Sequence, residues 1–543
     1  MISGRFTVDE PQNEPILSYA PGTGEKRILK DELARQLAEN VEMPLIIGGR
    51  EIRTGNIMTA TCPHDHSHVL GEYHAAGETE VEAAIEAALQ ARRKWAATPW
   101  YDRVAVFMKA SNLLAGKYRQ VLNAATMLGQ GKNVFQAEID SACELIDFLR
   151  FNARFAAEIY EEQPNSDVGE WNRMDYRPLE GFVFAVTPFN FTAIAGNLPS
   201  APAMLGNTVV WKPASSAVYS AAYLMRIFEE AGLPPGVINL VYGSGRSIGS
   251  QVLAHADLSG VHFTGSTGVF QDMWRTVGAN VEHYKTYPRL VGETGGKDFV
   301  LVHPSADIDV VATALSRGAF EYQGQKCSAA SRAYVPRSRW PEFWETSSAQ
   351  LDSMKMGPPT DFTNFVNAVI DRGAFENITE YIEFARTADD AEIIAGGGYD
   401  DSHGYFIEPT VILTENPNFK TMVEEIFGPV LTIMLYEDDD YEAMIEVVDA
   451  TSPYALTGSV IARDRDAIDV ALRGLRDAAG NFYINNQPTG AVVGRQPFGG
   501  GRASGTNDKA GSRWNLMRWI SPRTIKENMV PPTDYRYPFM DEK

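Results

Sequence analysis

Cysteine is scarce in this chain, whose 543 residues include only Cys62, Cys143 and Cys327. Three scattered cysteines cannot build a disulfide framework, and so low a number is typical of a reducing compartment. Long apolar runs are also lacking, because no stretch approaches the roughly 18 residues of a membrane span. The opening residues, with Asp9 and Glu10 close behind, resemble neither a signal peptide nor an acid-poor transit peptide. We therefore expect a cytoplasmic protein with no membrane partner.

Basic residues are in deficit, since 48 lysines and arginines stand against 70 aspartates and glutamates, a net charge of −22. So acidic a surface repels phosphate backbones and anionic lipids, which argues against nucleic acid as a partner. The remaining composition, 44% hydrophobic and 22% charged, is that of an ordinary globular protein without low-complexity tracts.

Short apolar runs alternate with helical patterns along most of the chain. An amphipathic helix is predicted over residues 78–97, and further helix over 104–114 and 137–152. The later segments are candidate strands at 181–186, 208–211, 237–241, 260–263, 299–302, 430–435 and 458–461, and helical patterns at 217–231, 247–255, 268–277 and 307–322. This alternation predicts parallel βαβ units, so we expect an α/β fold with two open, doubly wound sheets.

The length exceeds what one hydrophobic core serves, and the pattern divides the chain into four parts. Residues 1–60, rich in proline, glycine and charge, are expected to form an irregular N-terminal arm. Residues 61–295 and 296–490 contain the two alternating regions. Residues 491–543 form a C-terminal segment that begins glycine-rich and ends polar.

A glycine-containing loop, Gly324-Gln325-Lys326-Cys327-Ser328, presents the cysteine with chemical potential. The charge of Lys326 would favour the thiolate, which is the reactive form of a cysteine. A lone cysteine is more often a buried core residue, and Cys143, in a helical stretch, is interpreted in that way. Cys62 precedes a proline in a polar segment and offers nothing catalytic.

Glu293 lies 34 positions before Cys327, among glycines whose backbone can approach a ligand closely. A carboxylate there can act as a general base toward water, and the glycines only mildly disfavour the alternative of a turn glutamate that faces solvent. Paired with Cys327, it completes a set that can form a thioester and then hydrolyse it.

Asn190 belongs to Thr187-Pro188-Phe189-Asn190-Phe191, which follows a predicted strand at the edge where open α/β sheets place ligands. Its amide can donate to an oxyanion, and losing one such donor typically costs about 10²–10³ in rate. Proline and asparagine are also turn formers, so this segment by itself is better explained by a turn.

Several segments are suited to a nucleotide. Residues 263–268, Phe-Thr-Gly-Ser-Thr-Gly, lead from a strand into a helix, and free N–H groups there suit a pyrophosphate. Residues 243–249 space their glycines as G-x-G-x-x-x-G, which departs from the dinucleotide fingerprint, and we interpret them as a turn. Lys212 can bond ribose hydroxyls or simply be solvated. Glu425 and Phe427 can hold a ribose and flank a nicotinamide, or be a surface acid and a core ring.

His64, His66 and His68 alternate, which places three imidazoles on one face of a strand. We expect no functional metal, because the other six histidines lie near no carboxylate cluster.

Taken in order, the motifs at 187–191, 212, 265–268, 293, 327 and 425–427 resemble those of the NAD(P)-dependent aldehyde dehydrogenases, over residues 45–525. Within that superfamily the chain most resembles the Δ1-pyrroline-5-carboxylate dehydrogenases. The resemblance rests on residues 188–191 with 196–199, on 322–328, and above all on 496–509, which end in Ser-Gly-Thr-Asn-Asp-Lys.

The resemblance implies an NAD-binding domain over 61–295 and a catalytic domain over 296–490. It implies that Cys327 attacks glutamate γ-semialdehyde, that Asn190 and the Cys327 N–H hold the oxyanion, and that Glu293 activates water to release glutamate. This is the second step of proline catabolism. NAD is preferred to NADP by resemblance only, and its implied contacts are Thr187, Lys212, Gly265, Ser266, Thr267, Gly268, Val269, Glu425 and Phe427.

Substrate contacts are implied for Glu144, Phe191, Ser328, Gly490, Ala491 and Phe498. Glu144 lies where the family has an acid near the substrate amine, and the two phenylalanines would sandwich the aliphatic part. Many members have serine where this chain has Ala491. The lost hydroxyl would forfeit about 1.5–3 kcal/mol of bonding to a charged group, so we expect weaker substrate affinity or a rebuilt anchor.

Members of the superfamily exchange a β-hairpin when they form dimers and larger oligomers. A hairpin near residues 160–178 and the C-terminal segment would carry this contact, so a homo-oligomer is expected. Some relatives carry a fused proline dehydrogenase barrel. Fewer than 200 residues precede the cofactor motifs here, so a separate proline dehydrogenase, or an ornithine aminotransferase, is the expected supplier of substrate.

Other functions stay open on the motifs alone. They are an aldehyde dehydrogenase for another acidic aldehyde such as succinate semialdehyde, a CoA-acylating variant in which Glu293 is dispensable, and a non-catalytic protein on the same scaffold. A cofactor-independent thiol hydrolase is disfavoured, because no histidine lies within 20 residues of Cys327.

Overall fold

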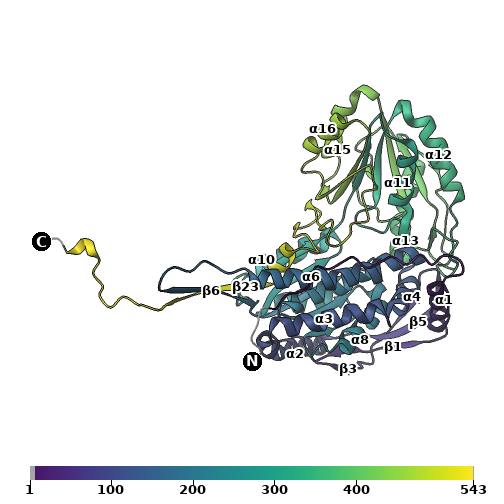
Figure 1. Ribbon diagram of the computed structural model, residues 1–543. Helices are drawn as coiled ribbons and strands as arrows, with labels where there is room; N and C mark the ends of the chain where they lie inside the picture. Colours follow the sequence, from purple (N-terminus) through teal and green to yellow (C-terminus); the bar gives the residue numbers. More distant parts are fainter. Residues whose placement is uncertain (1–5, 542–543) are drawn as a thin grey trace.

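Two seven-stranded sheets organise the chain, and each is the centre of its own lobe (Figure 1). The computed structural model describes residues 6–541. Among these residues, no helix is both long enough and apolar enough to cross a membrane. The predicted α/β fold with two doubly wound sheets is confirmed.

The first sheet has the strand order β11-β10-β7-β8-β9-β2-β3. Its central strands are parallel, whereas β2 and β3 join at the edge in antiparallel fashion. Buried apolar side chains fill β7, β8 and β10, which is why these strands read as short apolar runs. The strands are β2 Leu45–Ile47, β3 Arg50–Ile52, β7 Phe182–Thr187, β8 Thr208–Pro213, β9 Ile238–Leu240, β10 Leu258–Thr264 and β11 Arg289–Glu293.

Helices pack on both faces of this sheet. α2 begins and ends where the sequence pattern predicts. A π-helix, Glu138–Glu144, interrupts the helical stretch before α6, and such interruptions are frequent at functional sites. The helices are α1 Gly24–Leu37, α2 Glu78–Ala97, α3 Trp100–Ala115, α4 Arg119–Gln130, α5 Val134–Ala137, α6 Leu145–Glu161, α7 Thr192–Met204, α8 Val218–Ala231, α9 Gly245–Ala254 and α10 Thr267–Ala279.

The second sheet, of order β14-β17-β18-β13-β12-β20-β21, is parallel except for its edge strand β14. Its strands are β12 Asp298–Val302, β13 Ala330–Pro336, β14 Ala391–Ala395, β17 Thr410–Thr414, β18 Val430–Tyr436, β20 Thr457–Ile461 and β21 Asn481–Ile484. Its helices are α11 Ile308–Phe320, α12 Trp340–Ser353, α13 Arg372–Thr387, α14 Lys420–Val423, α15 Tyr441–Ala450 and α16 Arg465–Gly474, and α17 Arg513–Met517 follows near the C-terminus.

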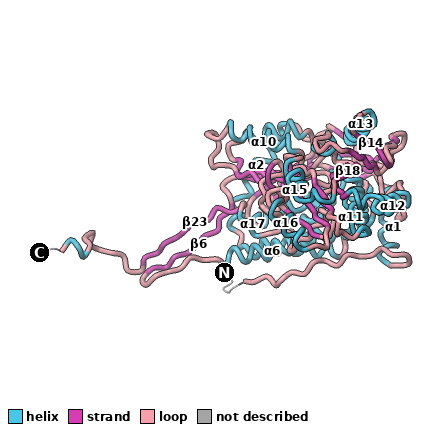
Figure 2. Tube along the Cα trace, turned by 90° about the horizontal axis from the view of Figure 1, so that it is seen from above, coloured by secondary structure: helices cyan, strands magenta, loops and turns pink. Residues whose placement is uncertain are grey.

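A two-stranded ribbon projects from the body and continues into the C-terminal tail (Figures 1 and 2). It pairs β6, Glu170–Pro178, with β23, Ile520–Asn528, in antiparallel register. The expected hairpin near residues 160–178 is therefore one strand of a ribbon whose second strand comes from the C-terminal segment.

The irregular arm predicted for residues 1–60 is wrong for much of its length. This region contains α1, the strands β2 and β3 of the first sheet, β1 Val41–Met43, and the start of β4 Ile57–Cys62. β1 and β4 pair with β5, Asp65–His74, in a small separate sheet. The sequence pattern did not reveal β1, β2 and β3, because each is only three residues long and so short a strand shows no periodicity.

Candidate active site

Cys327 lies on a tight loop between α11 and β13. Tyr322, Gln323 and Gly324 adopt left-handed backbone angles in succession, with φ of 52°, 54° and 64°. A Cβ on Gly324 would lie 2.1 Å from the carbonyl oxygen of Gly428, so only glycine fits there. The Gln323 amide donates to the carbonyls of Gly131 and Ala368, at 3.0 and 2.8 Å, and thereby ties the loop to both lobes.

Two cavities meet at Cys327, which lines both of them. One, of about 800 Å³, lies over the carboxyl ends of the first sheet's strands. The other, of about 500 Å³, lies against α6, the π-helix and the loop at 486–496. A thiol shared by two cavities can face a cofactor on one side and a substrate on the other.

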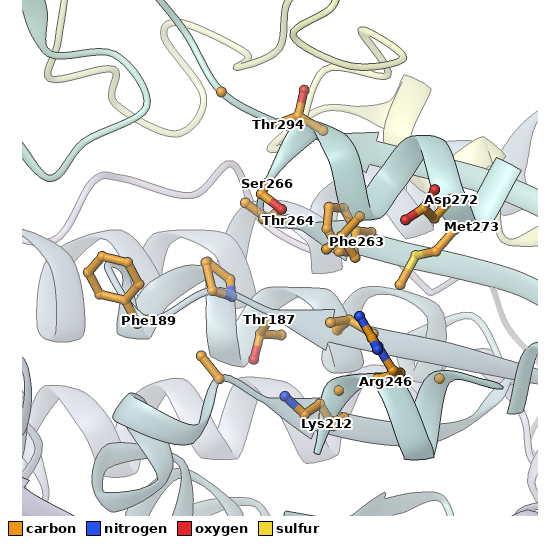
Figure 3. Close-up of a pocket in the computed structure, with 18 of the residues that line it drawn as sticks. Thr187, Phe189, Lys212, Arg246, Phe263, Thr264, Ser266, Asp272, Met273 and Thr294 are labelled. Atoms are coloured by element: carbon orange, nitrogen blue, oxygen red, sulfur yellow. The ribbon is translucent and has the colours of Figure 1, made fainter. Parts of the chain in front are cut away.

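The larger cavity gathers most of the predicted cofactor residues. Thr187, Lys212, Gly265, Ser266, Val269, Glu425 and Phe427 line it. Thr267 and Gly268 stand in the first turn of α10 beside it but do not line it. In Figure 3, Lys212 and Thr187 lie on the opposite side of the cavity from Ser266 and Thr294.

Polar groups in this cavity suit a nucleotide. Burial lowers the pKa of Lys212 to about 8, and its ammonium has no hydrogen-bond acceptor among residues 6–541. Ser266 precedes α10 without capping it through its side chain, so N–H groups of the first turn stay free for an anion. A Cβ on Gly245 would lie 3.6 Å from the Lys212 Nζ, in space that the glycine leaves open.

The interpretation of residues 243–249 as a turn is wrong. Helix α9 begins at Gly245 behind Ser244, whose side chain accepts from the N–H of Ser247. Gly245, Arg246 and Gly249 line the cavity, and Figure 3 shows Arg246 beside Lys212. The glycine spacing was the one signal that these residues line a nucleotide cavity. It was discounted because it departs from the usual dinucleotide fingerprint.

Glu425 and Phe427 lie at the cavity from the second lobe. One Glu425 carboxylate oxygen accepts from the Gly296 N–H at 2.9 Å, and a Cβ on Gly295 would collide with that carboxylate. Burial raises the pKa of Glu425 to about 7. Phe427, at a positive φ of 59°, packs edge to face against Phe189 with ring centroids 5.7 Å apart.

Asn190 is buried beside the Cys327 loop. Its amide donates to the Gln325 carbonyl at 3.0 Å, which fixes the orientation of the side chain. An amide carries two N–H donors, so one is left to face the cavity that Asn190 and Cys327 share.

The expectation that Lys326 activates Cys327 is wrong. The Lys326 ammonium pairs with the buried Glu321 carboxylate at 3.1 Å. Burial, with a smaller contribution from the negative charge of Glu293, raises the pKa of Cys327 well above its usual range.

Glu293 ends β11, but its side chain lines neither of the two large cavities. It projects into a third cavity, of about 40 Å³, which Glu144, Asp508 and Lys509 also line. Burial raises its pKa to about 8, while the charge of Lys509 opposes that shift. The Glu293 Oε1 is buried and has no hydrogen-bond partner among the described residues.

The predicted substrate residues come together in the 500 Å³ cavity. Glu144, Phe191, Ser328, Gly490, Ala491 and Phe498 all line it. The Ser328 hydroxyl donates to Thr489 Oγ1 at 2.8 Å, which joins the cysteine loop to the loop at 489–496. Burial raises the pKa of Glu144 to about 8.

Sequence reasoning missed other residues of this cavity. Residues 13–16 of the supposed arm form part of its wall, as does Asp147 of α6. Lys132 does not line the cavity, but it is fully buried, pairs with Asp140 at 2.7 Å, and its ammonium lies 4.0 Å from the ring centre of Phe191, which does line it. Nothing in its sequence context distinguishes Lys132 from a surface lysine, because its partners come from later elements.

His64, His66 and His68, between the end of β4 and the first half of β5, do not come together as a metal site. The His66 Nε2 lies 2.9 Å from the carbonyl oxygen of Asp401, and burial lowers the pKa of His64 to about 4. No group of three or more histidine, cysteine or acidic side chains suited to a metal occurs among residues 6–541.

The model of the aldehyde dehydrogenase family matches residues 52–525. The chain belongs to this family. Among its members, a mitochondrial Δ1-pyrroline-5-carboxylate dehydrogenase of Dictyostelium discoideum is 52% identical over 99% of the chain and 97% of that protein. The Δ1-pyrroline-5-carboxylate dehydrogenase of Mycobacterium tuberculosis, solved with NAD, is 52% identical with a TM-score of 0.97 over both whole chains. That from Thermus, also with NAD, is 33% identical with a TM-score of 0.90 over 96% of this chain and 100% of its own.

Proposed function

We propose that the chain oxidises L-glutamate γ-semialdehyde, the open form of Δ1-pyrroline-5-carboxylate, to L-glutamate. The observation that carries this proposal is Cys327 at the junction of two cavities, one suited to a dinucleotide and one to a small polar aldehyde. The names of the relatives at 52% identity support the same substrate.

NAD in the 800 Å³ cavity would be the oxidant, accepting a hydride from the hemithioacetal carbon on Cys327. Lys212 and Thr187 would hold its adenosine half, the free N–H groups at the start of α10 its pyrophosphate, and Glu425 with Phe427 its nicotinamide half. The residues present fit this group, because an unpaired ammonium and uncapped amides face the cavity.

The reaction begins when the Cys327 thiol gives its proton to solvent and the sulfur attacks the aldehyde carbon, whose carbonyl oxygen becomes the oxyanion of a hemithioacetal. The oxyanion of the hemithioacetal accepts hydrogen bonds from the second Asn190 N–H and the Cys327 backbone N–H. Oxidation re-forms the carbonyl and leaves a thioester on Cys327. Glu293 then takes a proton from water, which attacks the thioester carbon and expels the Cys327 thiolate.

Glu293 has to move for this last step. Its carboxylate occupies the small cavity behind the site, with one oxygen unpaired. A rotation about its side-chain bonds would bring the carboxylate to the thioester. A base with a pKa of about 8 is well matched to water activation near neutral pH.

The 500 Å³ cavity selects the substrate. The backbone N–H groups of Gly490 and Ala491 would receive the α-carboxylate, Glu144 would face the amine, and Phe191 and Phe498 would pack on the methylenes. The same cavity has to hold the γ-aldehyde at Cys327, a fixed distance from the α-carbon. An aldehyde without the amine leaves Glu144 without its partner.

We infer that the chain forms a homo-oligomer and receives its substrate from a separate enzyme. The projecting ribbon of β6 and β23 has unpaired strand edges and an exposed Trp171, which suits pairing with a second copy. A separate proline dehydrogenase would supply the substrate. A cytoplasmic location stays a prediction, since the names of several eukaryotic relatives place those proteins in mitochondria.

NADH formation with three preparations tests the function. Wild type is expected to oxidise glutamate γ-semialdehyde with kcat/KM at least about tenfold above that for succinate semialdehyde, since the lost ammonium contact is charge-assisted. Cys327→Ala is expected to have no activity, whereas Cys62→Ala retains it, because Cys62 is buried in another part of the fold. A preference for succinate semialdehyde would overturn the substrate but leave the mechanism.

A further inference from the structure

Residues 13–17, here called the strap, run beside the helical layer of the first lobe without forming a helix or strand. Figure 2 shows the chain passing α6 on its way from the N-terminus to α1. The strap is firmly held. The carboxylate of Glu14 pairs with Arg119 at 2.6 Å and Arg150 at 2.7 Å, and the Leu17 N–H donates to the buried Glu138 at 2.8 Å.

The strap forms part of the wall of the substrate cavity. Asn13, Glu14, Pro15 and Ile16 line the same 500 Å³ space as Cys327 and Ala491. An adjoining part of the wall is the loop of residues 489–496, here called the anchor loop. Two segments more than 470 positions apart therefore enclose the same ligand space.

Asn13 joins these walls through one amide. Its Nδ2 donates to Asp147 Oδ2 of α6 and to the carbonyl of Val493 in the anchor loop, each at 2.8 Å. Its Oδ1 accepts from Arg495 Nε of the same loop at 2.9 Å. Both donors and one acceptor position are thus used, and the geometry requires an amide rather than a carboxylate or a hydroxyl.

Asp147 of α6 accepts a second hydrogen bond from the strap. Its second carboxylate oxygen accepts from the Glu14 N–H at 2.7 Å, so the strap and α6 are joined twice. Glu144 lies one helical turn earlier, in the π-helix that meets α6, and lines the cavity. Asn13 therefore fixes the distance between the anchor loop and the element that carries Glu144.

We propose that Asn13 is a positioning residue for substrate selection, which sets the anchor loop at the spacing that an α-amino acid group requires. The inference rests on the proposed function, because it presupposes that the loop receives the α-carboxylate and Glu144 the amine. Without the Asn13 links, the loop loses the hydrogen bonds that join it to Asp147 of α6. Aldehydes that use only Cys327 and Asn190 do not depend on that spacing.

Three variants test the inference. Asn13→Ala removes all three hydrogen bonds, and Asn13→Asp keeps the size and the acceptor for Arg495 but replaces both donors with a charge that faces Asp147. Ser18→Ala is the matched control, since Ser18 is exposed in the adjoining segment and contacts neither the cavity nor the anchor loop. Each is assayed with NAD on glutamate γ-semialdehyde and on propionaldehyde, which has no amine or carboxylate, and melting temperatures are recorded.

We expect both Asn13 variants to raise KM for the semialdehyde about tenfold, the effect of one lost hydrogen bond to a charged group. Their kcat should stay within about twofold of wild type, and kcat/KM for propionaldehyde should not change. An unchanged KM for the semialdehyde, or an equal loss on both aldehydes, would overturn the inference. A wild type that is inactive on the semialdehyde would overturn the proposed function first.

Discussion

Replacing Glu293 with glutamine separates the two halves of the reaction. The glutamine has nearly the same size and cannot take a proton from water, so the thioester should form but not hydrolyse. General-base catalysis contributes about 10²–10⁴ in rate, and we expect steady-state turnover to fall by that factor. The acylation step, which uses Cys327 and Asn190, should be preserved.

The assay is rapid mixing of enzyme with NAD and glutamate γ-semialdehyde while NADH absorbance is followed. Glu293→Gln should give a burst of about one NADH per site followed by a very slow phase. Loss of the burst together with turnover would refute the reasoning, because it would make Glu293 necessary for attack by Cys327. A turnover rate like that of wild type would refute it equally.

The pH dependence follows from the burial of the same carboxylate. A pKa of about 8 leaves roughly a tenth of Glu293 ionised at pH 7, so the deacylation rate should rise with pH through about 8.

The stability of the folded chain should change with pH in the opposite direction. Because the folded-state pKa lies above the ordinary value of 4.5, the folded chain binds more protons, and stability falls as pH rises from about 4.5 to 8.

Three further predictions concern one residue beside Glu293, one in the cofactor cavity and one in the substrate cavity. Lys509→Met should move the acid limb of the deacylation profile to higher pH, because the lysine charge lowers the pKa of Glu293; an unmoved limb would contradict this. Lys212→Met should raise KM for NAD about tenfold at unchanged KM for the aldehyde, which initial rates measure. Ala491→Ser should lower KM for the semialdehyde about tenfold by adding a donor, and an unchanged KM would contradict this.

Periodicity predicted much of the fold, because parallel strands and their helices are regular and buried. α2 matches its predicted bounds, and the strands β7, β8, β10 and β12 lie within about two residues of their apolar runs. The strands β2 and β3 escaped notice because strands of three residues carry too little pattern. The ribbon needed knowledge of a partner strand more than 340 positions away.

The site was predictable where short motifs carry the chemistry and not where tertiary contacts decide it. One cavity gathers the residues that the motifs at strand ends indicated, which are those at 187, 212, 265–266, 327 and 425–427. Lys326 was misjudged because its partner, Glu321, reaches it only through the left-handed turn of the loop. The direction of the Glu293 side chain and the role of Asn13 depend on side-chain packing, which leaves no trace in local sequence.

The central claim is that Cys327 carries a glutamyl thioester during turnover. Glu293→Gln mixed with NAD and glutamate γ-semialdehyde, then quenched in acid, should show the added mass of one glutamyl group. Peptide mapping should place that group on Cys327. A missing adduct after a full NADH burst, or an adduct on Cys62 or Cys143, would contradict the account.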